Sequence, residues 1–75
     1  MNRKRRDKLK NAAKLIGEAS MIIDSVCSEE EDSMDNYPEN LQGTETYERM
    51  EGSVDIMNDL MDDLDHAVEK IMSVI

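Results

Sequence analysis

The chain has 75 residues, with 18 acidic side chains against nine Lys and Arg and a formal net charge of −9. A lone cysteine excludes an internal disulfide, one cysteine and one histidine exclude a four-ligand zinc site, and the short apolar runs exclude a membrane span. We therefore expect one small cytoplasmic domain over residues 1–75 that needs a second chain for stability.

The first apolar series runs through the N-terminal half with spacings that alternate between three and four residues. Such spacing is typical of a helix that packs along another helix. It predicts a helix over about residues 3–33, with a contact seam that comprises Leu9, Ala12, Ile16, Ala19, Ile23 and Val26.

The residues that follow, 34–44, are rich in turn formers and predict a loop. Pro38 lacks an amide hydrogen, while Asp35 and Asn36 hydrogen-bond readily to the local backbone. Gly43 tolerates a positive φ, and "PENLQ" is expected to form one extra turn that places Leu41 over the end of the core.

The second apolar series predicts a helix over about residues 45–74. Thr44 suits its N-cap, and Glu45 and Glu48 suit its first turn because they oppose the positive end of the helix dipole. Its seam comprises Tyr47, Met50, Val54, Met57, Met61, Leu64, Val68, Ile71 and Ile75.

The two seams predict an antiparallel helical hairpin and one register for it. Residue numbers that total 80 across the contact pair every seam residue of the first helix with one of the second, such as Ile16 with Leu64. This register also places Lys10 and Lys14 near Asp65 and Glu69, where ion pairs are expected.

A further row of apolar residues immediately precedes seam residues in both helices. In antiparallel packing these positions share one side of the hairpin, so we expect a second copy to bury them in a two-fold symmetric four-helix bundle. The expected dimer ridge comprises Leu15, Ile22, Leu60, Ala67 and Val74; the alternative is ordinary scattered surface exposure.

Charge is distributed unevenly along the chain. Residues 1–14 carry seven bases and one acid, a net +6, whereas residues 15–75 carry a net −15. The basic arm Arg3, Lys4, Arg5 and Arg6 is therefore a candidate contact for nucleic acid or another polyanion, against the alternative of a solvated terminus. The second helix has a candidate acidic partner face, which comprises Glu48, Glu51, Asp55, Asp59 and Asp62.

No catalytic residues, cofactor or metal ligands are expected. Asp63 and His66 have the spacing found in di-iron bundles, but they flank the seam residue Leu64 and therefore point outward. Cys27 borders the seam without an adjacent base, which is the environment of a small hydrophobic residue and not of a nucleophile.

The loop "DNYPENLQGTETYERME" resembles the central motif of small acidic helical-hairpin proteins of phages and prophages in Gram-positive bacteria. The resemblance covers nearly the whole chain, through "MNRKRRDKLK", "SEEEDSMDNYPENLQG" and "ERMEGSVDIMNDLMDDLDHAVEKI". It implies a mobile-element origin and no enzymatic activity.

The expected function is that of a non-enzymatic interaction protein that binds and modulates a protein partner. Its acidic face would imitate a nucleic-acid backbone and inhibit a host defence or nucleic-acid-handling factor. Direct nucleic-acid or nucleotide binding through Arg3–Arg6 and a structural role in a phage assembly stay open as alternatives.

Overall fold

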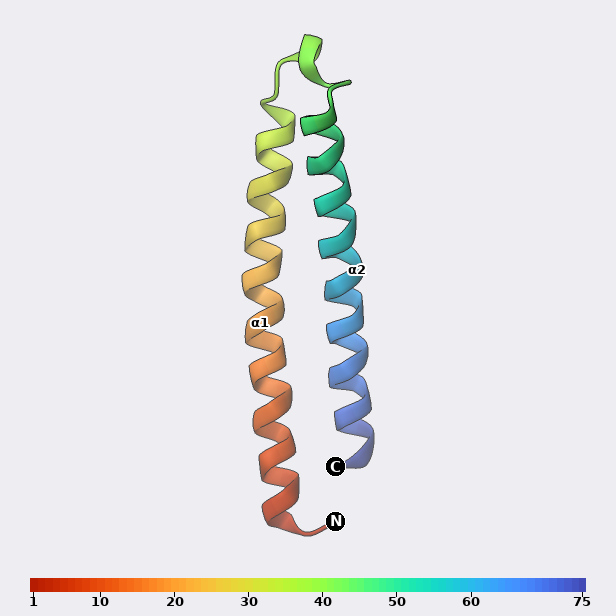
Figure 1. The fold of residues 1–75 in the computed structure, drawn as a ribbon. Coiled ribbons are helices and arrows are strands. Elements are labelled where there is room, and N and C mark those ends of the chain that lie inside the picture. The colour runs from red at the N-terminus through yellow and green to blue at the C-terminus, as the bar shows by residue number, and fades with distance from the viewer.

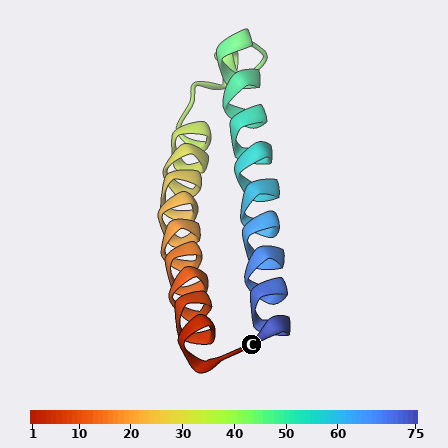
Figure 2. The ribbon, with the colours of Figure 1, turned by 60° about the horizontal axis from the view of Figure 1, so that its bottom comes forward.

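A computed structural model describes all 75 residues as two long helices joined by a short turn. Helix α1 spans Arg3–Asp35, the 3-10 helix η1 spans Glu39–Leu41, and α2 spans Glu45–Val74. The helices run side by side in opposite directions (Figures 1 and 2), and the molecule measures 60 × 15 × 12 Å. The all-helical hairpin expected from the sequence is confirmed.

Helix α1 has a cap at each end. The Asn2 side chain accepts a hydrogen bond from the backbone N–H of Arg5 at 2.9 Å, which satisfies one of the free donors of the first turn. At the other end, Asn36 donates from its side chain to the Asp32 carbonyl at 2.9 Å. Pro38 disfavours helical geometry at Tyr37, so the helix ends at Asp35, two residues later than expected.

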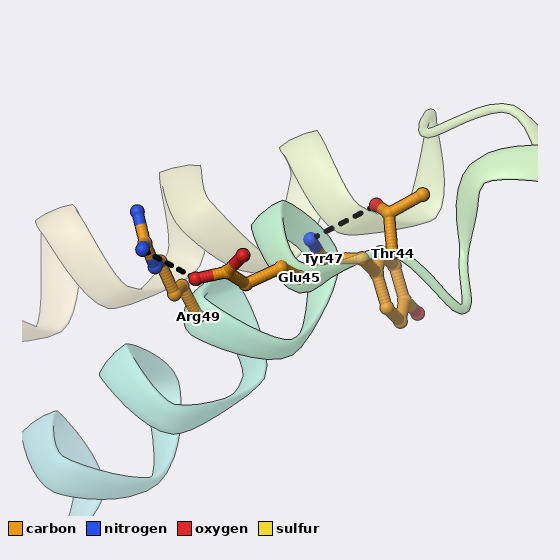
Figure 3. Close-up of polar contacts among 4 residues, drawn as sticks. All are labelled: Thr44, Glu45, Tyr47 and Arg49. Carbon is orange, nitrogen blue, oxygen red and sulfur yellow. Dashed lines mark hydrogen bonds and ion pairs between the residues drawn. The ribbon is translucent and has the colours of Figure 1, made fainter.

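Helix α2 begins at a threonine cap (Figure 3), and the hydroxyl group of the same threonine also hydrogen-bonds to the loop. Thr44 Oγ1 accepts from the Tyr47 N–H at 3.5 Å and donates to the Leu41 carbonyl at 2.7 Å. Glu45 and Glu48 lie in the first turn, where they oppose the dipole as expected.

The expected extra turn of the loop is present as η1, but the expected place of Leu41 is wrong. Leu41 is 40% exposed and does not cover the core. Gly43 has no positive φ, because the 3-10 turn and the Thr44 hydrogen bonds reverse the chain without one. The end of the hairpin is closed instead by Tyr37 and Tyr47, whose ring centroids lie 5.6 Å apart.

The seam of α2 consists of the expected residues. In part of α1, the residue that faces α2 is the one that follows the expected residue. All nine expected α2 positions are half-buried. In α1, Ala19 and Val26 are exposed, whereas the next residues, Ser20 and Cys27, face α2. The observed α1 seam comprises Leu9, Ala13, Ile16, Ser20, Ile23, Cys27, Glu30 and Met34, and Tyr37 continues it beyond the end of the helix. The expected seam residue Ala12 is half-buried as well and lies beside Ala13 at the edge of the seam.

The observed contacts replace the expected register. Tyr37 and Tyr47 have numbers that total 84, and Cys27 lies 3.8 Å from the Asn58 side chain, a total of 85. The helices are thus offset by about one turn from the expected total of 80. The offset moves Lys10 and Lys14 beyond Asp65 and Glu69, and the expected ion pairs do not form.

The hairpin alone buries very little. Cys27 is the only buried residue, and the accessible surface is 5758 Å². A compact protein of this mass, 8.6 kDa, exposes about 4,700 Å². The hairpin therefore exposes more surface than a compact protein of its mass, and this excess is available for association.

Candidate interaction surfaces

An apolar face runs along one side of the hairpin, across both helices. Each of its members immediately precedes a seam residue, and in an antiparallel helix pair such positions lie on the same side. This apolar face comprises Ala12, Leu15, Ala19, Ile22 and Val26 of α1 and Ile56, Leu60, Ala67 and Val74 of α2.

Most of the apolar face is accessible to solvent. Ile22 is 67% exposed and Leu15 55% exposed. The face includes all five residues of the expected dimer ridge, of which only Ala67 is half-buried. The ridge prediction omitted Ala12, Ala19, Val26 and Ile56. Three of them were missed because Ala12, Ala19 and Val26 were assigned to the seam.

The acidic face lies mainly on the opposite side of the hairpin. Glu48, Glu51, Asp55 and Asp62 each follow a seam residue, and Asp59 points outward between them. All five carboxylates are exposed and none is in an ion pair. This arrangement leaves a continuous stripe of negative charge along α2.

The basic arm projects past the end of α2. In the observed register, residues before Leu9 have no facing position, because Leu9 already lies opposite Ile75. Arg3, Lys4, Arg5 and Arg6 are all exposed. The one ion pair in the chain joins Arg49 to Glu45 within α2 (Figure 3), so the bases of the arm have no acidic partner in their own hairpin.

Cys27 is held in an acidic, desolvated environment. Its Sγ lies 3.6 Å from Glu31 Oε1 and 3.8 Å from Asn58 Oδ1, two acceptors that share the single thiol hydrogen. Burial raises the pKa of the Cys27 thiol, and the negative charges of Glu31 and Asp24 raise it further. A thiol with a raised pKa holds little thiolate at neutral pH and reacts slowly.

The chain shows no pocket and no group of three or more potential metal ligands. Asp63 and His66 are both exposed on α2. Neither helix combines the length and apolar character needed to cross a membrane.

Comparison with protein-family models, curated proteins and solved structures found no match to this chain.

Proposed function

We propose that this chain is a non-enzymatic, phage-type interaction protein of the cytoplasm. It dimerises through its apolar face into a four-helix bundle and uses its acidic face to bind and modulate a protein partner. The partner is a protein with a basic groove for nucleic acid, such as a host defence factor, and the acidic face inhibits it by occupying that groove.

The unpaired carboxylates on α2 are the observation that carries this proposal. Glu48 and Asp62 are fourteen residues apart, which is about 21 Å along a helix. One DNA strand carries about six phosphates in that length, and the acidic face carries five carboxylates. The two charge densities are therefore comparable, and a groove shaped for a phosphate backbone meets a similar row of charge.

The test is capture from a lysate of a Gram-positive host with matched variants. The wild-type chain is compared with a Glu51→Lys/Asp55→Lys/Asp59→Lys variant, in which the acidic face is reversed. We expect the wild type to retain a nucleic-acid-binding protein that DNA displaces, and the variant to lose it.

A second triple reversal, Glu18→Lys/Asp32→Lys/Glu39→Lys, changes the net charge equally but lies on the outer side of α1 and in the loop, outside the acidic face. It should retain the partner. Equal loss of binding in both variants would mean that net charge, and not this face, attracts the partner, and would overturn the assignment of the site.

The basic arm favours one second candidate, direct binding of nucleic acid. Its four bases lie beyond the end of α2 and are free of intrachain ion pairs. Salt-dependent DNA binding that disappears when Arg3–Arg6 are replaced by Ala, with the acidic face intact, would select this function over mimicry.

A further inference from the structure

We infer that a second copy covers the apolar face head-to-tail, with the two loops at opposite ends of the bundle and α1 antiparallel to α1 of its partner. This inference rests on the dimer in the proposed function. It adds the relative orientation of the copies and the charges that select it.

The exposed surface area of the hairpin indicates that a second copy covers the apolar face. The hairpin exposes about 1,000 Å² more than a compact protein of its mass, and a stable interface buries about 800 Å² on each partner. The apolar face is the side on which that area is available. One further copy is therefore enough to give the chain an ordinary ratio of surface to mass.

The sequence of α1 along the apolar face shows how the copies align. Five apolar residues, from Ala12 to Val26, are centred on Ala19, which is also the midpoint of α1. The face is flanked by Lys8 on the N-terminal side and by Glu29 on the C-terminal side, each of which immediately precedes a seam residue. Reversing the helix about Ala19 superimposes apolar on apolar and exchanges this base for this acid.

Antiparallel α1 helices that cross near Ala19 therefore complement one another. Lys8 lies opposite Glu29 of the other copy, because the two residues are nearly equidistant from the centre. Ala12 meets Val26, and Leu15 meets Ile22. The small side chain of Ala19 lets the helices approach closely at the two-fold axis.

The charges of the whole rod favour the same orientation. The open end, residues 1–14 and 70–75, carries eight bases and one acid, a net +7. The loop end, residues 28–56, carries ten acids and one base, a net −9. Head-to-tail pairing places +7 against −9 at both ends of the bundle.

The alternative two-fold dimer, with both loops at one end, covers the same face at an electrostatic cost. It places the two loop ends, each −9, side by side and does the same with the two open ends, each +7. Like charges in contact are destabilising. Head-to-tail pairing also gives the projecting arm acidic neighbours that its own α2 does not supply.

The test measures the distance between spin labels at two sites in the full-length chain. Glu39→Cys places a label in the loop, and Glu18→Cys places one near the middle of α1; Cys27→Ala removes the native thiol from both. Head-to-tail pairing predicts a separation near the 60 Å length of the rod for the Glu39 site. The Glu18 site should give roughly 20 Å, about two helix diameters.

Each other result has a distinct meaning. Short distances at both sites, with a sedimentation mass twice the 8.6 kDa of one chain, would overturn the orientation and leave the dimer standing. A mass of one chain with no measurable distances would overturn the dimer itself. If Cys27→Ala lowers the helicity, the same labels are placed with Cys27 retained, because its buried thiol labels slowly.

Discussion

Cys27 shows how a single side chain reports the packing of the hairpin. It is the one residue that both helices enclose, and Asn58 reaches it from α2. Its thiol therefore distinguishes the folded hairpin from an isolated α1, in which the same position would be open to water.

The raised pKa of Cys27 predicts a stability loss in alkali. A thiol with a raised pKa binds its proton more tightly in the folded chain than in the unfolded one. Its contribution is fully present below about pH 8.5, the pKa of an unfolded thiol, and is lost as the pH rises through the higher folded value. The free energy of unfolding should therefore fall more steeply above this pH in the native chain than in Cys27→Ala.

Urea denaturation from pH 7 to pH 10.5 measures this difference. Alkylation by iodoacetamide gives a second reading, because the native thiol should react much more slowly than the same thiol in urea. Identical pH slopes for the native chain and the variant would show that the thiol is not desolvated.

At the scale of the elements, the two glycines inside helices predict a gain in stability. A Cβ at Gly17 or Gly52 would meet no atom within 4 Å, so alanine fits at both sites. Gly17→Ala and Gly52→Ala should each stabilise the fold by about 1 kcal/mol, through the difference in helix propensity. Gly43→Ala, outside both helices, is the control in urea denaturation and should give a smaller change.

The Thr44 cap predicts that its removal lowers the free energy of unfolding. Thr44→Ala removes the acceptor for the Tyr47 N–H and the donor to the Leu41 carbonyl. It should cost about 1 kcal/mol in urea denaturation. Thr44→Ser retains the hydroxyl and should restore most of the loss; an equal loss in both variants would mean that the methyl group, and not the cap, matters.

The helices were predictable from the sequence, but their mutual register was not. Periodicity, Pro38 and Thr44 place both elements and the turn between them, because each acts through local backbone chemistry. The register depends on long-range packing, and a seam with alternating spacings of three and four fits its partner at more than one offset. The offset of 80 requires Ala19 and Val26 in the seam, whereas in the structure their polar or smaller neighbours Ser20 and Cys27 face α2.

Some of the candidate surfaces were likewise predictable from the sequence, and one was not. The acidic face and the basic arm were predictable because exposed charge is visible in composition and spacing. The full apolar face was not, since its α1 part depends on which side of the helix meets α2. Tyr37 was the missing signal: counted as a seam residue opposite Tyr47, it gives the observed total of 84.

At the scale of the whole molecule, the fold separates two kinds of surface. The apolar face precedes the seam in both helices, and most of the acidic face follows it. A second copy can therefore cover one side of the hairpin and leave the acidic face of each copy free for a partner. Dimerisation and partner binding are thus expected to be independent.

The charge pairs across the proposed dimer predict a rescue experiment. Lys8→Glu should weaken the homodimer, because the new acid faces Glu29 of the other copy. By symmetry two pairs are lost, and at roughly 0.5 kcal/mol each the dimer Kd should rise about 5-fold. Mixing this variant with Glu29→Lys should form a heterodimer that neither variant forms well alone.

Sedimentation equilibrium at low salt measures both effects, and Lys10→Glu is the matched control. Lys10 follows the seam residue Leu9, so it lies on the side away from the apolar face, and its reversal changes the net charge by the same amount. The control should keep the native Kd more closely, because its charge does not face the other copy. In 1 M salt the Debye length shrinks to about 3 Å, and the variants should then dimerise alike. Equal weakening by the control and by the Lys8 reversal at low salt would contradict the head-to-tail arrangement, since it would show that total charge alone governs association.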